Sequence, residues 1–497
     1  MTELTLPNSV KSIGDRAFAY CSGLTELTLP NSVTSIGNCA FGGCSGLTEL
    51  TLPNSVTSIG YDAFAYCSGL EKITVESGNS CYDSRDNCNS IIDTETNTLI
   101  VGCKNSIIPN SVTSIGRYAF GGCSGMTELI LPNSLRSIGY AAFYSCRGLT
   151  ELTLPNSVTS IGNPNSVTSI GNSAFGGCSG LEKITVDGGN KRYDSRDNCN
   201  SIIETGTNTL IVGCKNSVIP NSVTSIGDGA FRGCSGLTEL ILPNSVTSIG
   251  EYAFYYCSGL TELTLPSSVT SIGESAFQDC SGLTKLTLPS SVTSIGESAF
   301  QDCSGLTKLT LPNSLTEIGK YAFRGCSGLT ELILPNSVRS IGDYAFYSCR
   351  GLTELTLSNS LTSIGKYAFK GCIGLEKITS LAEIPPMCGR GVFDGVNKTN
   401  CELIVPEGSV AAYKQAEVWN EFSNISGFSG VEDTVADGNT IRVIGNQIEI
   451  SGYFTSVEVY GVNGTLIYKG KDNVVTVPSA GIYLVHVAGK TRKIVVE

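Results

Sequence analysis

The sequence predicts a solenoid of stacked coils followed by a small antiparallel β-sandwich, and three observations lead to this fold class. A 23-residue repeat containing Ala-Phe-x-x-Cys recurs along most of the chain. A fixed period in the twenties indicates an architecture in which each coil buries its apolar face against the next. After residue 438, runs of alternating apolar and polar residues are typical of antiparallel strands. The thirteen repeat phenylalanines are Phe18, Phe41, Phe64, Phe120, Phe143, Phe175, Phe231, Phe254, Phe277, Phe300, Phe323, Phe346 and Phe369.

The repeat that begins at Leu24 shows how each coil is expected to form. Its pattern Leu-x-x-Leu-x-Leu is the strand signature of a leucine-rich repeat. Leu27 and Leu29 are expected to point into the core. Because side chains alternate along a strand, Glu26 and Thr28 are expected to point outward. The Ala-Phe-x-x-Cys segment then suits a short helical or turn segment that packs its apolar side inward.

The outward strand positions of successive repeats line up in two columns. The first column carries glutamate, replaced by lysine in some repeats, and the second carries mostly threonine. Both columns should lie on the sheet face, so we expect a polar, largely acidic surface that binds a protein or a glycan. A face that is charged only to keep the protein in solution is the alternative. The candidate interaction residues are Glu26, Thr28, Glu49, Thr51, Glu128, Glu151, Thr153, Glu239, Glu262, Thr264, Lys285, Lys308, Glu331, Glu354 and Thr356.

Two near-identical inserts, at about residues 76–108 and 187–219, interrupt the period. Each holds two short apolar strands around a polar turn, which predicts a β-hairpin. Turns centred on residues 95–96 and 206–207 place Ile92 opposite Leu99 and Ile203 opposite Leu210. The same register brings two cysteine pairs within disulfide reach, although free thiols are an equal alternative. The candidate disulfides are Cys88 with Cys103 and Cys199 with Cys214.

Verbatim copies occur at two places in the array. Residues 155–163 are repeated as residues 164–172, and we expect the extra copy to bulge outward as a loop. The repeat that starts at Pro266 recurs unchanged from Pro289. Such copies indicate that the number of coils changes easily, which favours a structural spacer as an alternative function.

Composition and motifs argue against several classes of function. A net charge of -12 and a pI near 4.8 disfavour nucleic acid and anionic membranes as partners. No apolar run approaches the roughly 20 residues that span a bilayer. Thirteen of the 21 cysteines follow the repeat phenylalanine by three residues, which predicts packed free thiols. With His486 as the only histidine and no Cys-x-x-Cys pair, we expect no metal, no cofactor and no enzymatic activity.

The end of the chain departs from the repeat. The array is expected over residues 1–378, and residues 379–425 form a modified last coil. There, Tyr413, Trp419 and Phe422 suit a short amphipathic helix, over residues 411–422, that covers the end of the core. Residues 426–438 are rich in glycine, serine and acidic residues and suit a linker. Residues 439–497 should form the β-sandwich, with Asn463-Gly464 as a hairpin turn.

The motifs IGxxAFxxCxxLTELTLPNSVTS, YDSRDNCNSII…TNTLIVGCKN and VFDGV…LIVPEGSVAAYKQAEVW closely resemble BspA-like leucine-rich repeat proteins over residues 1–425. This resemblance implies a bacterial surface or secreted protein, many relatives being from Bacteroidetes, that binds host matrix, host cells or other bacteria. The opening MTELTLPNSV is the repeat with methionine in place of leucine, so we expect a fragment or a misplaced start, without a signal peptide.

The tail, VEVYGVNGTLIYKG through GIYLVHVAGKTRKIVVE, resembles the C-terminal sorting domain of type IX secretion cargo. This second resemblance implies export to the outer-membrane surface. The sequence therefore predicts a monomeric, non-enzymatic adhesin at the cell surface or secreted. A spacer without a ligand and a glycan-binding module are the alternatives, although a glycan site on the strand face would need exposed aromatic residues that are almost absent there.

Overall fold

The computed structural model describes residues 2–161, 173–428, 433–434, 440–444, 447–451, 456–461, 466–472, 474–479, 481–487 and 490–496. It divides into two compact units, unit 1 at Met1–Leu283 and unit 2 at Thr284–Glu497. The extra tandem copy at residues 164–172 and the Asn463-Gly464 turn lie outside the described residues. The domain boundaries given above stay predictions.

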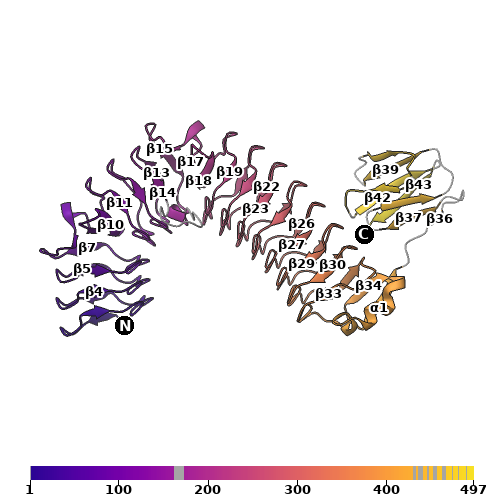
Figure 1. Ribbon diagram of the computed structural model, residues 1–497, viewed down its shortest axis with the longest axis horizontal. Helices are drawn as coiled ribbons and strands as arrows, with labels where there is room; N and C mark the ends of the chain where they lie inside the picture. Colours follow the sequence, from indigo (N-terminus) through magenta and orange to yellow (C-terminus); the bar gives the residue numbers. More distant parts are fainter. Residues whose placement is uncertain are drawn as a thin grey trace. The chain divides into compact units, whose positions relative to one another are not determined.

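In unit 1, most repeat coils contribute one short strand to a parallel strand face. The register joins equivalent positions of successive coils, so that Glu3 pairs with Glu26 and Leu4 with Leu27. In the longer strands, exposed and buried residues alternate as expected for a sheet with one covered side. The strands are β1 (Glu3–Thr5), β3 (Glu26–Thr28), β5 (Glu49–Leu52), β7 (Lys72–Val75), β13 (Glu151–Leu154), β15 (Lys183–Val186), β20 (Glu239–Ile241) and β22 (Glu262–Thr264) (Figure 1).

A second parallel ladder in unit 1 is built from Ser-Ile dipeptides later in each coil. Ile36 pairs with Ile59 of the next coil, and Ile36 is buried. In the turn before this ladder, the Ser55 hydroxyl donates to the Val33 carbonyl of the preceding coil at 2.7 Å. The strands are β2 (Ser12–Ile13), β4 (Ser35–Ile36), β6 (Ser58–Ile59), β11 (Ser114–Ile115), β12 (Ser137–Ile138), β14 (Ser160–Ile161), β19 (Ser225–Ile226), β21 (Ser248–Ile249) and β23 (Ser271–Ile272).

The third side of each coil, which we call the turn face, carries the Ala-Phe-x-x-Cys motif. Two residues four positions apart have positive φ in most coils, for example Cys39 (51°) and Gly43 (78°). Because left-handed residues interrupt a right-handed helix, the described part of this side consists of turns, apart from one short 3₁₀ helix, η2 (Ser173–Phe175). Backbone hydrogen bonds join successive coils here too, as from Phe41 N–H to Ala63 O at 2.8 Å.

Phenylalanine rings and thiols fill the core between these three sides. The rings of Phe231 and Phe254 have centroids 5.1 Å apart and planes within 5° of parallel. The neighbouring cysteine ladder is also buried from Cys44 onward, and its members form no disulfide among the described residues. The Cys257 thiol, for example, donates to the Phe231 carbonyl at 3.0 Å.

Each insert forms the expected antiparallel hairpin, and Ile92 faces Leu99 as predicted. Ile203 likewise faces Leu210 in the second insert. The first strand of each insert packs beside the hairpin, and the last strand pairs with the Ser-Ile ladder. The elements are β8 (Tyr82–Asp83), η1 (Arg85–Asn87), β9 (Ile91–Asp93), β10 (Thr98–Val101), β16 (Tyr193–Asp194), η3 (Arg196–Asn198), β17 (Ser201–Glu204) and β18 (Thr209–Gly213).

The predicted cysteine pairs do not face each other. A register shift between Leu99 and Val101 moves the pairing by one residue, and β17 carries the same irregularity. As a result, the Cys103 thiol points to the Asn89 carbonyl and the Cys88 thiol to the Ser90 carbonyl. The second insert repeats this arrangement, and the four thiols are free and buried in this structure: Cys88, Cys103, Cys199 and Cys214.

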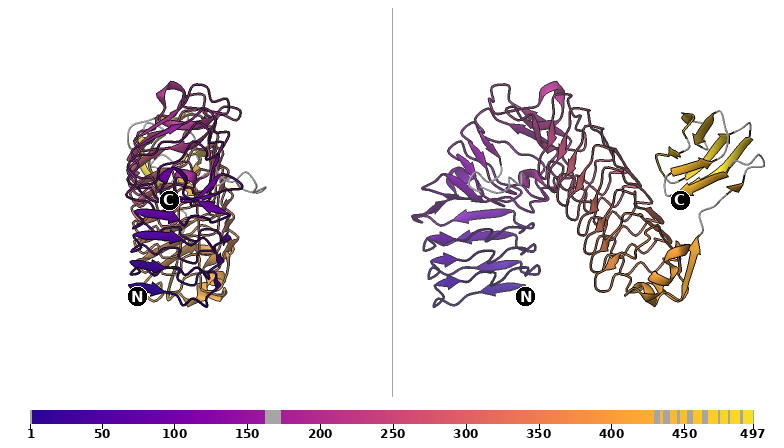
Figure 2. Two further views of the ribbon diagram at one scale, coloured as in Figure 1. Left: turned by 90° about the vertical axis from the view of Figure 1, so that its left-hand side faces the viewer. Right: turned by 45° about the vertical axis from the view of Figure 1, so that its right-hand side comes forward.

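Unit 2 continues with the same kind of coil (Figure 2). Its strand-face strands are β24 (Lys285–Thr287), β26 (Lys308–Thr310), β28 (Glu331–Ile333), β30 (Glu354–Leu357), β32 (Lys377–Ser380), β34 (Glu402–Pro406) and β35 (Asn424–Phe428). The second ladder contains β25 (Ser294–Ile295), β27 (Glu317–Ile318), β29 (Ser340–Ile341), β31 (Ser363–Ile364) and β33 (Met387–Cys388). Because β35 pairs with β34, residues 426–428 of the predicted linker belong to this sheet.

A cap covers the last coil, as the sequence indicates. It consists of η4 (Glu407–Ser409), α1 (Val410–Gln415) and η5 (Trp419–Glu421), so the helical part is shorter than predicted. Tyr413 and Trp419 are fully buried, and Phe422 is 4% exposed. The Trp419 indole donates to the Pro386 carbonyl at 2.9 Å, and its ring packs 5.4 Å from that of Phe393.

The last part of unit 2 contains the predicted antiparallel β-sandwich. One sheet has the order β36 (Asp433–Thr434), β37 (Thr440–Ile444), β38 (Gln447–Ser451), β41 (Val474–Thr476). The other has the order β40 (Leu466–Gly470), β39 (Val457–Gly461), β42 (Gly481–Val487), β43 (Lys490–Val496). Buried Ile448 and Ile450 from the first sheet share one core cluster with Val459 and Val485 from the second.

Candidate interaction surface

The parallel register brings the predicted outward residues into aligned columns on the strand face. In unit 1, Glu49 pairs with Lys72, and their side chains form an ion pair at 3.1 Å. Beside them, the Thr51 and Thr74 hydroxyls are hydrogen-bonded at 3.1 Å. The Glu151 and Lys183 side chains repeat the ion pair at 3.0 Å. Both columns are therefore real features of the fold, built by equivalent positions of successive coils.

Like charges also lie next to each other on this face. In unit 1 Glu239 pairs with Glu262, and in unit 2 Lys285 pairs with Lys308. Glu331 and Glu354 pair in the same way. Like charges directly opposite on a sheet cost roughly 0.2–1 kcal/mol, so these positions do not stabilise the array.

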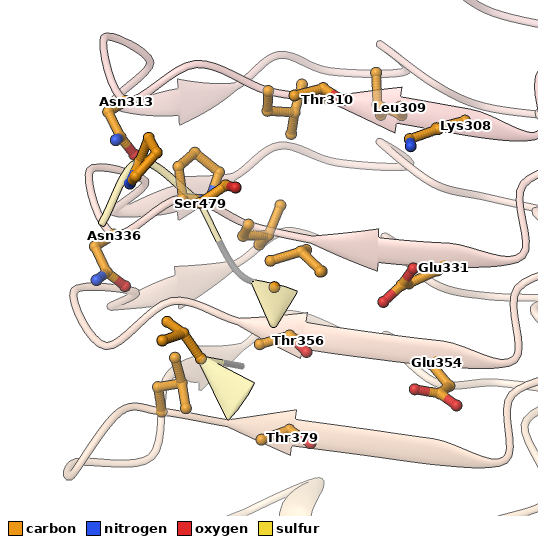
Figure 3. A pocket seen from close by; sticks show the side chains of 18 of the residues that line it. Lys308, Leu309, Thr310, Asn313, Glu331, Asn336, Glu354, Thr356, Thr379 and Ser479 are labelled. Atoms are coloured by element: carbon orange, nitrogen blue, oxygen red, sulfur yellow. The ribbon is translucent and has the colours of Figure 1, made fainter. Parts of the chain in front are cut away.

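Figure 3 shows part of this face in unit 2. Lys308, Glu331 and Glu354 extend from β26, β28 and β30 on the same side of the sheet. Thr310, Thr356 and Thr379 follow the second column. The two columns thus continue over several consecutive coils of unit 2.

All fifteen predicted interaction residues are exposed except Thr356, which is partly covered. Glu128 holds the expected place in its coil but lies outside any strand. Isoleucine replaces threonine in some coils, and Ile130 and Ile241 are 74% and 78% exposed. These two side chains add apolar contact points to the polar face.

Tyrosines on the turn face are a feature that the sequence analysis did not identify. In unit 2 the Tyr321 and Tyr344 rings stack at 5.0 Å, and Tyr367 follows at 5.2 Å. The Lys320 and Lys370 ammonium groups lie 4.9 and 4.8 Å from the centroids of neighbouring rings. The signal was the tyrosine that directly precedes Ala-Phe in these repeats, a position that the repeat places on the turn face.

Burial controls the titration of the core thiols. It raises the pKa of Cys123 and of Cys372 to about 12 in each case. Such thiols stay protonated at neutral pH, which makes them poor nucleophiles. Among the residues that the structure describes, no group of three or more His, Cys, Asp or Glu side chains is arranged to hold a metal ion. Over the same residues, no helix has both the length and the apolar character needed to cross a membrane.

Solved structures with similar architecture come from several bacteria. A leucine-rich repeat protein from Bacteroides ovatus is 24% identical, covers 86% of this chain and 94% of its own, and gives a TM-score of 0.36. One from Eubacterium ventriosum is 22% identical, with coverages of 75% and 82% and a TM-score of 0.45. A leucine rich cell surface protein from Faecalibacterium prausnitzii is 23% identical, with coverages of 76% and 88% and a TM-score of 0.38. No curated protein sequence is significantly similar to the chain.

A comparison with protein-family models identifies the family of the repeat array. The model described as the BspA type leucine rich repeat region matches in six copies, over residues 1–100, 100–196, 163–205, 212–329 and 293–400. These ranges cover most of the array that the structure shows. Because they also span more than half of the chain, the protein belongs to the BspA-type leucine-rich repeat family.

Proposed function

We propose that this chain is a non-enzymatic bacterial adhesin, secreted or held at the outer-membrane surface, that binds a protein partner through the strand face. The proposed partners are host matrix proteins, host cells or other bacteria. The family membership supports a role in protein binding or at the surface.

One observation carries the proposal. The strand face presents aligned, exposed charged and polar side chains over successive coils, while the alternate leucines are buried. Adjacent like charges such as Glu239 and Glu262 repel each other in the free protein. A partner with complementary charge would relieve this repulsion, and charge complementarity sets the specificity and association rate of such interfaces.

The test measures binding of the purified full chain to arrayed matrix proteins, host cells and glycans. The variant carries Glu239→Lys and Glu262→Lys. The matched control carries Glu95→Lys in an insert turn and Glu297→Lys on the turn face, so both variants have the same net charge. We expect saturable binding to a protein that the strand-face variant weakens at least about tenfold and the control leaves unchanged.

Other outcomes favour other functions. Weaker binding by the control variant alone would place the site on the inserts or the turn face. Binding confined to glycans would support a glycan-binding module. Absence of binding to every target would support a structural spacer, in agreement with the verbatim repeats.

We also propose that the C-terminal β-sandwich directs surface delivery, because its sequence resembles a sorting domain. The test deletes residues 439–497 in the native bacterium and measures surface display with an antibody to the array. We expect the array to remain folded and to accumulate inside the cell envelope. Normal display of the truncated chain would rule out this role.

A further inference from the structure

A cluster of tyrosines surrounds one arginine on the turn face of unit 1. We call this group the Arg232 cluster: Arg232, Tyr66, Tyr118, Tyr144, Tyr252 and Tyr255. Its members come from coils that are far apart in sequence, yet their rings make contact. Tyr66 and Tyr144 have ring centroids 6.2 Å apart, and Tyr118 and Tyr144 have centroids 6.3 Å apart.

The inserts explain why these coils meet. Neither insert carries an Ala-Phe turn, so the turns on either side of it bond directly to each other. The Tyr66 N–H donates to the Gly121 carbonyl at 2.7 Å across the first insert. The Gly177 N–H donates to the Arg232 carbonyl at 2.7 Å across the second.

Glycines leave room for the tyrosine side chains between the coils. A Cβ added at Gly176 would lie 3.1 Å from the Tyr144 ring, so that ring rests directly on the glycine backbone. The neighbouring Gly177 also has no side chain. Tyr144 therefore reaches past this coil to Arg232, which comes from the coil after the second insert.

Arg232 lies among aromatic rings, and no acidic side chain pairs with it in the described part of the chain. Its guanidinium lies 5.1 Å from the Tyr144 centroid, 5.0 Å from that of Tyr255 and 5.7 Å from that of Tyr252. Within the described residues, the Arg232 side chain donates one hydrogen bond, from Nη1 to the Ser173 hydroxyl at 3.3 Å, and its buried Nε has no acceptor.

No ion pair to Arg232 occurs within the described part of the chain. Residues 162–172, the internal segment of unit 1 that the structure does not describe, contain no Asp or Glu. Among the described residues, the groups that face the Arg232 guanidinium are therefore the tyrosine rings and the Ser173 hydroxyl.

A second arginine on the same face shows how this chain completes such an arrangement. Arg117 lies 5.3 Å from the centroids of both Tyr118 and Tyr140. Unlike Arg232, it also forms an ion pair with Asp62 at 3.2 Å. In this fold, a guanidinium that packs on tyrosine rings thus also binds a carboxylate. Such charge-assisted hydrogen bonds are stronger than those between neutral groups.

We infer that the Arg232 cluster is a second interaction surface, which binds an aspartate or glutamate side chain of a protein partner. Tyrosine and arginine are the residue types that dominate the energy of protein interfaces. Burial raises the pKa of Tyr118 and of Tyr255 to about 12, so their hydroxyls remain protonated donors at neutral pH. This surface is separate from the strand face and does not depend on the function proposed for it.

The ring orientations favour a protein over an acidic glycan. Tyr66 and Tyr144 cross at 73°, and Tyr252 and Tyr255 cross at 81°. Ring edges and the guanidinium therefore cover ring faces that a sugar would need for stacking. The hydroxyls and Arg232 remain as recognition groups, and these suit a single carboxylate.

The test uses the full chain and a peptide array with a central Asp or Glu in varied flanking sequences. Matched peptides carry Asn or Gln at the centre. We expect a subset of acidic peptides to bind and their amide counterparts to bind at least about tenfold more weakly. R232Q should lose this binding at least about tenfold, whereas R117Q, which changes an arginine that already has its carboxylate, should stay within about twofold.

Three controls keep the result decisive. Thermal unfolding of R232Q shows whether the variant folds. If the variant does not fold, a competition experiment on the unmodified chain takes its place, in which free glutarate and free glutaramide each compete with a bound acidic peptide. Equal competition by the two compounds would overturn the proposal. The variant with Glu239→Lys and Glu262→Lys should bind acidic peptides normally, which separates this surface from the strand face. Arg232-dependent binding of polygalacturonate without peptide binding, or no discrimination between acidic and amide peptides, would also overturn it.

Discussion

The thiol of Cys67 donates a hydrogen bond to the carbonyl oxygen of Phe41, which lies 26 residues earlier, at a distance of 3.2 Å. The same bond joins Cys146 to the carbonyl of Phe120 and recurs in other coils of both units. The repeat cysteine therefore has two roles, because it fills the core as a small apolar side chain and links its coil to the preceding one. Its place three residues after the phenylalanine follows from this geometry.

Loss of one such thiol should weaken the array measurably. Cys257 is fully buried and donates to the Phe231 carbonyl at 3.0 Å. Cys257→Ala removes the donor and leaves a small cavity, so we expect the free energy of unfolding to fall by about 1–2 kcal/mol. Urea unfolding followed by circular dichroism measures this. Cys39→Ser is the control, because Cys39 is only half-buried and lies outside the ladder; an equal loss there would contradict the argument.

The thiol ladder should also make the array sensitive to alkali. Burial raises the pKa of Cys123 and of Cys372 from 9.0 to about 12. Below pH 9 these thiols are protonated in both the folded and the unfolded chain, and their stabilising effect is complete. Between pH 9 and about pH 12 only the unfolded chain ionises them, so the free energy of unfolding falls as the pH rises.

Urea unfolding at pH 8, 9, 10 and 11 measures this decline. Cys123→Ala should show a lower free energy of unfolding at pH 8 but a shallower fall with pH, because it has one thiol fewer to ionise. A free energy of unfolding that stays constant from pH 8 to pH 11 would show that burial of the thiols does not couple to ionisation.

Much of the array could be predicted because its signal is repeated many times. The alternation in Leu-x-x-Leu-x-Leu assigns Glu26 to the surface, and the 23-residue step aligns it with Glu3, as the register shows. The cap could be inferred from bulky residues such as Trp419 at the point where the repeat ends. These conclusions need only local periodicity and the requirement to cover an apolar core.

Other features depend on single residues or on contacts between distant coils. The register shift after Leu99 moves Cys103 away from Cys88, and a strand pattern does not encode such a bulge. The Arg232 cluster forms because an insert lets Tyr144 and Arg232 approach across a glycine-lined coil. These two residues lie 88 positions apart in the sequence, and the sequence alone does not show that the backbone brings them together.

One glycine in the first insert should tolerate no side chain. Gly102 takes the place that a repeat phenylalanine would occupy, and a Cβ there would overlap the ring of Phe120. Gly102→Ala should therefore lower the free energy of unfolding by about 1–3 kcal/mol through overpacking. Gly206→Ala is the matched control, since a Cβ at Gly206 meets no atom within 4 Å. Thermal unfolding of both variants decides the point, and equal melting temperatures would contradict this account of the insert.

The cap should depend on one indole hydrogen bond. Trp419 is fully buried, and its Nε1–H donates to the carbonyl of Pro386, itself a buried residue. Trp419→Phe keeps an aromatic ring but leaves that carbonyl without its partner, which should cost about 1–3 kcal/mol. Because coils of a solenoid are stabilised by their neighbours, the loss should appear first as faster amide hydrogen exchange in α1, β34 and β35.

In this variant, amide hydrogen exchange in coils far from the cap should stay unchanged. The control is Tyr20→Phe, at a residue that is 84% exposed, which should change exchange neither in the cap nor in the distant coils. Uniformly faster exchange along the array would instead mean that the cap and the coils unfold as one cooperative unit. In that case the bond from Trp419 to Pro386 would stabilise the whole array rather than its end.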